Sequence, residues 1–399
     1  MTLSIITNAS CFDDAVLPPG EPRHLGTPDL YNPAVFYDSP GKAQGCLHAA
    51  QELQGLIAPQ DFMPIIRSER TAEIAALLRA HSADYLVALE SASQQAQDRS
   101  LPNSPAFVHL GLEAAISAGT FSAALKAVGA SYSAIDAAML RPEDTAFALV
   151  WPPGHHAERE QAMGFCYLSN AALAALYARD HSVQLNPTRN NRVAVIDIDH
   201  HRGNGTASVL ADEPDTLFID LLYRSPYDHN RRRYTDGVYN EALDRFSEGT
   251  KEYPYTHDDV EQHLTAHQIT SAPNIVSLEF EGVQNPETIL ERFLTDALPK
   301  LREFQPDVIL WSVGLDSALG DPLGGLGNLP SSFYTMIRGV RIAFPAARHI
   351  GVLEGGYDKD RWSSCLKSTL LGFHDEANGQ ALRSSLFERY RARFIENPT

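Results

Sequence analysis

The chain has 399 residues, is 44% hydrophobic and carries a formal net charge of −18. Its apolar content is ample for a sizeable core in one large or two ordinary domains, but its acidity argues against a nucleic-acid partner, because phosphate binding needs clustered Lys and Arg. The four cysteines show no CxxC pairing, which argues against a disulfide scaffold or a thiolate zinc site.

The amino-terminal part predicts no targeting or membrane segment. The first residues lack the basic start and small-residue cleavage site of a signal peptide, and no apolar run approaches the roughly 20 residues that a membrane helix needs. We therefore expect a soluble, cytoplasmic protein with no membrane partner. About the first hundred residues are expected to be mostly helical, notably over Thr71–Ala80 and Ser82–Leu89, and to pack around a sheet formed further along the chain.

From about residue 106 onward, apolar runs alternate with stretches of helical pattern. Each run is short, nearly continuous in apolar residues and bounded by polar or turn residues, as expected for a strand covered on both faces. Apolar residues from Ile289 to Leu298 share one helical face, and Pro299 interrupts that pattern. This alternation predicts a single α/β domain over residues 1–399, with a mainly parallel central sheet flanked by helices. The runs are Thr145–Val150, Arg192–Asp197, Thr216–Leu222, Asn274–Leu278, Asp307–Val313 and His349–Leu353.

Residues 223–271 are different, because they form a long polar stretch rich in Arg, Asp, Tyr and His, with RRRY at Arg231–Tyr234. A structureless loop of this length is uncommon in a compact domain. We expect an insertion with some structure of its own, either at the rim of a site or at a contact in a homo-oligomer.

Four segments crowded with polar, metal-capable or glycine residues follow directly after four of the predicted strands. In open α/β sheets, sites form beyond the carboxyl ends of the strands. We therefore expect these segments to build one site. They are PPGHH at Pro152–His156, DIDHHRGNGT at Asp197–Thr206, GLDSALGDP at Gly314–Pro322 and EGGYD at Glu354–Asp358.

The second and third segments offer metal ligands. Asp197, Asp199 and His201 alternate at a strand end, so their side chains can point to one side, and the glycines of Gly203–Gly205 allow a sharp turn past a close-packed centre. Asp316 adds a carboxylate. Two carboxylates and one histidine suit a catalytic zinc with an open position for water and substrate, and would tolerate iron(II) or cobalt. A polar strand end before a capped helix, and an aspartate acting as a cap, are the structural alternatives.

The first and fourth segments offer acid–base groups. His155 and His156 can both reach the site if the preceding Pro-Pro-Gly sets a tight turn, and two imidazoles near an activated water supply a general base and an electrostatic partner. Each would need an orienting group, for which Asp197 and Asn204 are the nearest candidates. Tyr357 is placed to donate its hydroxyl to a developing oxyanion, although a tyrosine packed at a turn is the structural alternative.

With these segments in place, the sequence resembles the arginase/deacetylase superfamily, specifically the histone deacetylase-like amidohydrolases of the class II and acetylpolyamine amidohydrolase branch. Motifs in the same order, from roughly residue 80 to Tyr357, carry the resemblance. It implies an arginase/deacetylase-like fold and zinc-dependent hydrolysis of a small acylated amine. The motifs are PPGHHA at Pro152–Ala157, GFCYLSN at Gly164–Asn170, DxDxH at Asp197–His201, GDPLGGL at Gly320–Leu326 and LEGGYD at Leu353–Asp358.

The resemblance implies two bound cations. Asp199, His201 and Asp316 would hold one catalytic zinc ion. A structural monovalent cation, usually potassium, would lie beside the zinc, against the same strand end and its neighbour. The residues that match its surroundings are Asp197, Asp199, His201, Asp220 and Leu221.

The resemblance also assigns catalytic roles. His156 would act as general base and then as general acid, while His155 would stay paired with Asp197 and act electrostatically. Asn204 takes the second partner position, as in the class II and polyamine-type branches, where class I enzymes have an aspartate. Tyr357 would polarise the scissile carbonyl.

Substrate residues follow from the resemblance in the same way. Gly164 and Phe165 would line the narrow acyl-chain channel, and Glu113 falls where family members place an acidic rim residue that holds the substrate. The sequence departs from the family pattern beside the site without removing a ligand or the catalytic pair. These departures are Trp151, Arg202, Leu222 and Leu315, and they leave the substrate and any product-exit route open.

Other functions and substrates are compatible with parts of the sequence. An arginase-like ureohydrolase with two manganese ions would need further Asp and His ligands, which the segment around Asp316 does not provide. A non-catalytic protein of the same fold could bind acylated amines. Acetylpolyamine, acetyl-lysine and an aryl or xenobiotic amide all remain open as substrates.

Overall fold

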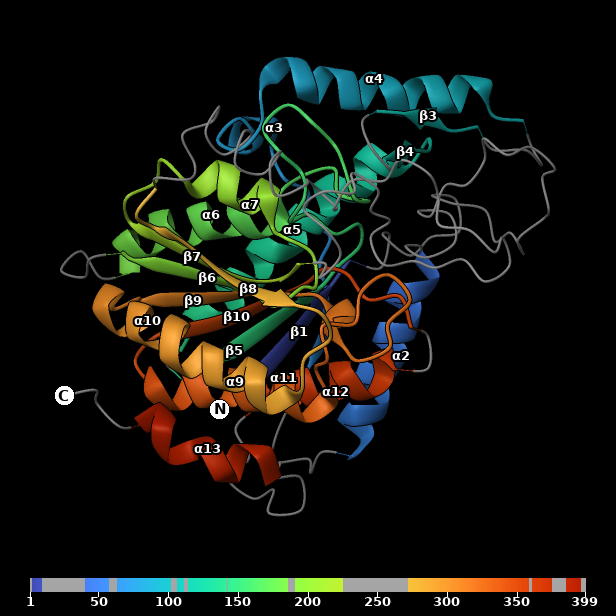
Figure 1. The fold of residues 1–399 in the computed structure, drawn as a ribbon. Coiled ribbons are helices and arrows are strands. Elements are labelled where there is room, and N and C mark those ends of the chain that lie inside the picture. The colour runs from blue at the N-terminus through green and yellow to red at the C-terminus, as the bar shows by residue number, and fades with distance from the viewer. Residues whose placement is uncertain are drawn as a thin grey trace, which may run out of the picture.

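A parallel sheet of eight strands forms the centre of the computed structural model (Figure 1), which describes residues 2–8, 40–56, 63–101, 106–110, 114–141, 143–185, 191–224, 272–358, 361–374 and 385–395. Every neighbouring pair in this sheet is parallel, which confirms the predicted α/β class. In spatial order the strands are β2 (Ile65–Arg67), β1 (Leu3–Thr7), β5 (Thr145–Leu149), β10 (Arg348–Leu353), β9 (Val308–Val313), β6 (Val193–Asp197), β7 (Thr216–Arg224) and β8 (Ile275–Glu281).

The six strands expected from apolar runs are all present, with ends shifted by a few residues. The expectation of a mostly helical amino-terminal part was wrong at its start, because β1 and β2 join the sheet there. A short β-branched run such as Leu3–Thr7 has no periodicity that separates strand from helix, and pairing with β5 decides its state. A small antiparallel pair of β3 (Val108–His109) and β4 (Ala115–Ile116) lies outside the main sheet.

The helices near residue 80 differ from the predicted ranges. Helix α3 is only Ile74–Leu77, whereas α4 runs over Ala83–Arg99, well past the predicted end. The Ser82 side chain accepts the backbone N–H of Tyr85 and caps the start of α4. No helix in the described part of the chain is long and apolar enough to cross a membrane.

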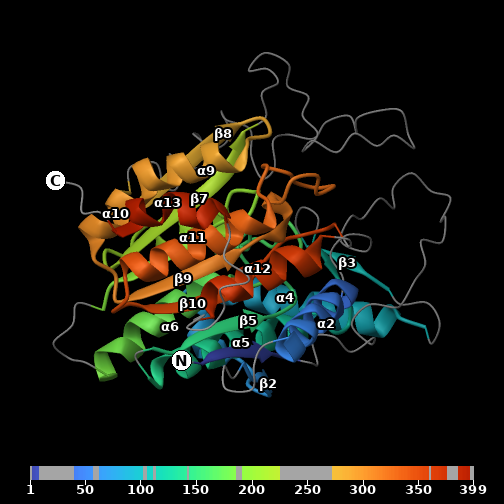
Figure 2. The same cartoon turned by 90° about the horizontal axis from the view of Figure 1, so that it is seen from below.

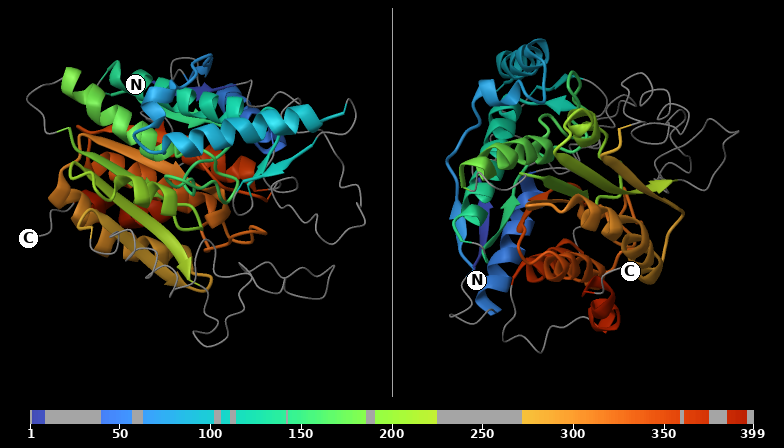
Figure 3. Two further views of the ribbon diagram at one scale, coloured as in Figure 1. Left: turned by 90° about the horizontal axis from the view of Figure 1, so that it is seen from above. Right: turned by 90° about the vertical axis from the view of Figure 1, so that its left-hand side faces the viewer.

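Helices cover both faces of the sheet (Figures 1 and 3). One face packs on α5 (Thr120–Met139), α6 (Asn170–Leu185) and α7 (Asn204–Leu210). The other face packs on a second group of helices, which lie in front of the sheet in the view of Figure 2. Burial on both faces explains why the strands have continuous apolar runs. The second group is α2 (Pro40–Leu56), α9 (Pro286–Arg292), α10 (Leu298–Phe304), α11 (Pro330–Ala343), α12 (Trp362–Phe373) and α13 (Ser385–Ile395).

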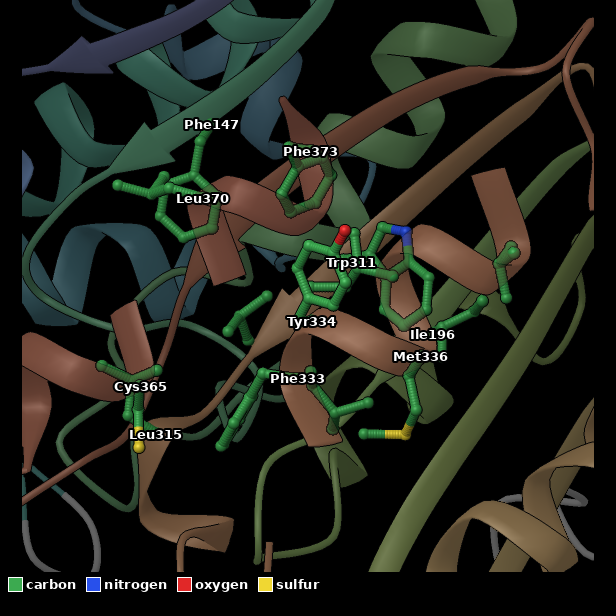
Figure 4. Close-up of a cluster of buried hydrophobic side chains, with 14 of the residues drawn as sticks. Phe147, Ile196, Trp311, Leu315, Phe333, Tyr334, Met336, Cys365, Leu370 and Phe373 are labelled. Carbon is green, nitrogen blue, oxygen red and sulfur yellow. The ribbon is translucent and has the colours of Figure 1, made fainter. Parts of the chain in front are cut away.

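Aromatic side chains fill the core between the sheet and this second group (Figure 4). Phe147 on β5 meets Phe373 of α12 edge to face, with ring centroids 5.8 Å apart. The interruption expected at Pro299 is one π-helical turn, Phe293–Ala297, between α9 and α10. Pro299 then lies in the first turn of α10, and the π-helical turn before it lets the helical path continue past the proline.

The predicted insertion meets the described chain at the end of β7. That strand continues to Arg224, so the first residues assigned to the insertion belong to the sheet. Residues 225–271, including the RRRY sequence, lie outside the described residues.

Candidate metal and catalytic site

Four neighbouring strands carry the four polar segments. In the sheet, β5, β10, β9 and β6 are consecutive, although they are far apart in the sequence. Adjacent strands lie about 4.8 Å apart, so the four carboxyl ends span only about 15 Å. The sheet order therefore brings the four segments together at one edge.

Asp199, His201 and Asp316 form a compact group, called here the metal triad. Each offers a ligand atom, and these atoms lie within 4.8 Å of one another. His201 Nδ1 lies 3.2 Å from Asp199 Oδ1 and 3.3 Å from Asp316 Oδ2. Asp199 and His201 follow β6, and Asp316 lies in the 3-10 turn Leu315–Ser317 after β9, so two adjacent strands supply the three side chains.

The metal triad fits a divalent cation. Asp199 and Asp316 are completely buried, so water cannot screen their negative charges and a nearby cation stabilises them. Although Asp316 Oδ2 is buried, its 3.3 Å contact with His201 Nδ1 does not have good hydrogen-bond geometry. Carboxylate oxygens and an imidazole nitrogen are the donors that zinc takes in catalytic sites.

His155 and His156, the histidine pair, lie against this group with ring centroids 4.0 Å apart. His155 Nδ1 lies 3.1 Å from Asp197 Oδ2, and its Nε2 lies 3.7 Å from Asp199 Oδ2. His156 Nδ1 lies 2.7 Å from Asn204 Oδ1. Both expected partners therefore contact the histidines, and Asp197 and Asn204 are themselves buried.

The two histidines have opposite pKa shifts. Burial lowers the pKa of His155, but the Asp199 and Asp197 carboxylates outweigh burial and raise it to about 10. Burial also lowers the pKa of His156, and there the neighbouring His155 and His201 imidazoles reinforce it and hold the pKa well below its usual range. One ring is therefore cationic and the other neutral near pH 7, as an electrostatic group and a base require.

Glu354 was not singled out from the sequence, although it lies at the centre of the site. Its Oε2 accepts the backbone N–H groups of Gly154 and His155 at 2.7 and 3.1 Å, and its Oε1 accepts the Ser312 hydroxyl at 2.9 Å. The carboxylate thus ties the turn that carries the histidine pair to β9 and β10. A buried charge directly after an apolar strand was the available signal.

The turn after β10 is packed against the metal triad. A Cβ on Gly355 would lie 2.2 Å from Asp316 Oδ2 and 2.6 Å from Asp199 Oδ2, so only glycine fits there. Asp321, also missed from the sequence, accepts the backbone N–H of Tyr357 at 2.7 Å. Tyr357 therefore sits two residues from a backbone that touches both metal-triad carboxylates.

Three apolar or aromatic side chains gather beside this turn: Phe165, Leu323 and Tyr357. The Phe165 and Tyr357 rings meet edge to face at 5.9 Å. Gly164 and Phe165 both have left-handed backbone, with φ of 53° and 64°, which is uncommon for a phenylalanine and fixes where its ring is presented. Lys42 of α2, unexpected from the sequence, is buried, donates to the Glu354 carbonyl at 2.5 Å and lies 5.2 Å from the Tyr357 ring centroid.

The sequence also predicted potassium ligands, an acidic rim residue and departures from the family pattern. Asp220 and Leu221 are buried on β7 beside β6, and neither carboxylate oxygen of Asp220 has a hydrogen bond of good geometry. Burial raises the pKa of Asp220. Glu113 lies outside the described residues. Among the departures, Trp151, Arg202 and Leu315 are buried and Leu222 is half-buried.

A second set of possible ligand groups lies next to the first: His155, Cys166 and Glu354. Its His155 and Glu354 members already hold hydrogen bonds within the site. It is not the second set of Asp and His ligands that a dimanganese centre would need.

Comparison with known proteins agrees with this geometry. The profile of the histone deacetylase domain matches residues 37–373. A rice protein named histone deacetylase 10, chloroplastic, is 30% identical over 326 residues, which cover 79% of this chain and 63% of that protein. A mouse protein named polyamine deacetylase HDAC10 is 31% identical over 259 residues, covering 63% of this chain and 34% of that protein. The chain thus spans only part of the length of these relatives.

A solved structure shows the same fold. The crystal structure of the HDA15 HD domain aligns with a TM-score of 0.68 over 95% of this chain and 92% of that chain, at 20% sequence identity. The family profile covers most of the chain, and the resemblance inferred from the motifs is thereby confirmed. This chain belongs to the histone deacetylase family.

Proposed function

We propose that this chain is a zinc-dependent amidohydrolase that removes the acyl group from an acylated amine. The observation that carries the proposal is the buried metal triad beside two histidines of opposite pKa shift, because cation, base and electrostatic partner then share one water-poor site. Zinc held by Asp199, His201 and Asp316 would supply Lewis-acid chemistry, lowering the pKa of a water and polarising the amide carbonyl.

The chain's own residues supply the proton transfers. His156 donates Nδ1–H to Asn204, so its Nε2 is the nitrogen that takes the proton of the attacking water. The same nitrogen then returns the proton to the departing amine. His155 keeps its proton beside Asp197 and Asp199 and stabilises the negative charge that develops in the transition state.

Tyr357 and the neighbouring apolar groups bind the substrate. The Tyr357 hydroxyl donates a hydrogen bond to the carbonyl oxygen as it gains charge. Gly164 and Phe165 line the channel for the acyl chain, and the contact of Phe165 with Tyr357 and Leu323 supports this assignment. A monovalent cation, usually potassium in this family, would be held beside the end of β6, and the buried Asp220 carboxylate on the neighbouring strand is a suitable ligand.

A small cationic acylamine, such as an acetylated polyamine, is the substrate class we favour. The net charge of −18 and the acidic Glu113 support it, as does the similarity to a protein named polyamine deacetylase. Acetyl-lysine is the alternative. A cytoplasmic location stays a prediction, and the rice relative's own name places that protein in the chloroplast.

The test is a panel of acylated amines. Release of the free amine is measured for an acetylated diamine, an acetyl-lysine peptide and acetanilide, with zinc content determined on the same sample. We expect one zinc per chain and turnover of the acetylated diamine, with His156→Ala as the inactive control. A zinc-loaded protein that binds these compounds but hydrolyses none would instead favour a non-catalytic binding protein.

A further inference from the structure

Asn204 lies between the proposed base and a carboxylate that the mechanism above does not use. Its Oδ1 is 2.7 Å from His156 Nδ1, and its Nδ2 is 2.7 Å from Glu158 Oε1. All three side chains are buried. His156 and Glu158 follow β5, whereas Asn204 begins α7, so this hydrogen-bonded chain links two elements across the site.

The surroundings of Asn204 define which way its amide faces. Besides Glu158 Oε1, the Nδ2 atom meets Met163 Sδ at 3.2 Å and the His156 carbonyl oxygen at 3.4 Å. A carboxylate, a thioether and a carbonyl all accept hydrogen bonds and none of them donates when the carboxyl is ionised. A flipped amide would set its own oxygen against three acceptors, so the network assigns the NH₂ group to this side.

The amide orientation in turn defines the tautomer of His156. An amide oxygen can only accept, so His156 Nδ1 must carry a hydrogen and Nε2 keeps its lone pair. Only that tautomer can take a proton at Nε2. If the Asn204 NH₂ group faced His156, Nδ1 would become the acceptor and Nε2 would carry the hydrogen, which is the wrong state for a base.

We propose that Glu158 is the positioning residue that holds Asn204 in this orientation and thereby keeps His156 in its base-competent tautomer. Glu158 is suited to the task because its oxygen lies 2.7 Å from Asn204 Nδ2, closer than the thioether at 3.2 Å or the carbonyl at 3.4 Å. The inference rests on the proposed function, since it gives His156 the role of base.

The backbone of Glu158 is fixed on both sides. Its N–H donates to the Gln161 carbonyl at 3.0 Å. Its carbonyl lies 2.9 Å from His81 Nδ1, while His81 Nε2 accepts the Ser169 N–H at 3.0 Å, so Nδ1 is the donor. The backbone that carries this carboxylate is therefore fixed before substrate binds, as expected for a residue that sets another residue's orientation.

Glu158→Gln tests the proposal with little change of shape. The introduced amide can donate, so it lets Asn204 turn its oxygen toward position 158 and its NH₂ toward His156. We expect kcat to fall about 10–100-fold, as for loss of an orienting partner, with KM and zinc content nearly unchanged. Glu160→Gln, two residues along and exposed, is the matched control and should leave kcat unchanged.

The double variant Glu158→Gln/Asn204→Asp supplies a rescue that a merely structural role would not give. A carboxylate at position 204 can only accept, so His156 Nδ1 carries its hydrogen again whichever way the neighbour faces. Asn204→Asp alone would bring two carboxylates together and should lower kcat. We expect the double variant to exceed both single variants. A double variant no more active than Glu158→Gln, or full kcat in Glu158→Gln, would overturn the proposal.

A spectroscopic measurement needs neither a folded variant at position 158 nor a substrate. In ¹⁵N-histidine-labelled, zinc-loaded protein, the His156 signals, assigned by their loss in His156→Gln, should show a protonated Nδ1 and an unprotonated Nε2. The opposite tautomer refutes the role of Glu158. Absence of amide hydrolysis would instead refute the proposed function, so the two failures are distinguishable.

Discussion

His155 and His156 are consecutive in the sequence yet have different environments. His155 faces two carboxylates, whereas His156 faces an uncharged amide and lies near two other imidazoles. Each side chain thereby acquires the protonation state that its proposed role requires. Pairs of titratable groups whose surroundings push their pKa values apart are typical of acid–base sites.

Tyr357→Phe tests the proposed oxyanion donor. The ring would keep its contact with Phe165, so the fold and the metal triad should be unaffected. We expect kcat to fall by about 10²–10³-fold, the loss typical of one oxyanion donor, with KM and zinc content nearly unchanged. An unchanged kcat would rule out this role for the hydroxyl.

The buried His81 ring should make the stability of the fold sensitive to acid. Burial lowers its folded-state pKa to about 4, from an ordinary value of 6.5, so the neutral ring stabilises the fold above pH 6.5, and this contribution is lost as the pH falls toward 4. The full difference is on the order of 3 kcal/mol. Glutamine can donate and accept like His81 but does not titrate, so His81→Gln should remove this part of the acid sensitivity.

The measurement is the free energy of unfolding in urea for both metal-free proteins between pH 7.5 and about 4.5. The advantage of wild type over His81→Gln should shrink as the pH falls. His349, whose pKa burial lowers to about 3, stays in both proteins and cancels from the difference. Parallel curves would show that His81 is not a buried neutral ring.

Two glycines, each following a strand, let the backbone pass close to the carboxylates of the metal triad. A Cβ on Gly355, after β10, would lie 2.2 Å from Asp316 Oδ2, and a Cβ on Gly314, after β9, would lie 1.9 Å from Asp199 Oδ2. Gly355→Ala should therefore displace both carboxylates. We expect the zinc affinity to fall by at least about 10-fold, as when a metal ligand loses its orientation.

Gly55→Ala is the control for this prediction. A Cβ there meets nothing within 4 Å, and the position lies near the end of α2, where alanine is the better helix former. Zinc affinity, measured by competition with a chelator, should be unchanged in Gly55→Ala. Equal affinity in Gly355→Ala and wild type would show that the turn after β10 does not press on the metal triad.

The strand ends were the most predictable part of the chain. Strands buried on both faces leave continuous apolar runs, and the polar residues after them stand out, so His155, His156, Asp199, His201 and Asp316 could be grouped from the sequence. The structure brings these residues together, while their catalytic roles stay predictions. By contrast, β1 is too short to show a period, and its pairing partner lies about 140 residues away.

Residues that act through long-range hydrogen bonds escaped prediction. Asp321 and Glu354 accept backbone N–H groups from segments that only the fold brings near them. Glu158 likewise accepts the side-chain N–H of Asn204, and no spacing in the sequence records these contacts. Lys42 lies about 310 residues from the carbonyl it contacts. Such long-range partners follow from the order of the strands, which the apolar pattern does not determine.

At the scale of the whole molecule, net charge predicts how the rate responds to salt. A charge of −18 attracts cationic substrates, and ions screen that attraction over about 10 Å at 0.1 M salt. We expect kcat/KM for acetylated polyamines to fall as ionic strength rises, whereas neutral acetanilide should hardly respond. Glu113→Gln should weaken the salt dependence if that carboxylate holds the substrate at the rim.

Initial rates at several salt concentrations provide this comparison, with wild type and Glu113→Gln measured on both substrates. Faster turnover of neutral anilides than of acetylpolyamines at low salt would exclude the cationic-substrate proposal and favour the aryl amide alternative. A slope that Glu113→Gln leaves unchanged would instead assign the steering to the overall charge.

Zinc titration is the most direct test of the metal triad. Chelator-stripped wild type and Asp316→Ala receive zinc stepwise, and bound zinc and amide hydrolysis are measured at each step. We predict that one equivalent restores full activity to wild type, and that Asp316→Ala neither holds zinc nor turns over, because two remaining ligands make too weak a site. Stoichiometric zinc with full activity in Asp316→Ala, or full activity of the stripped wild type, would contradict this prediction.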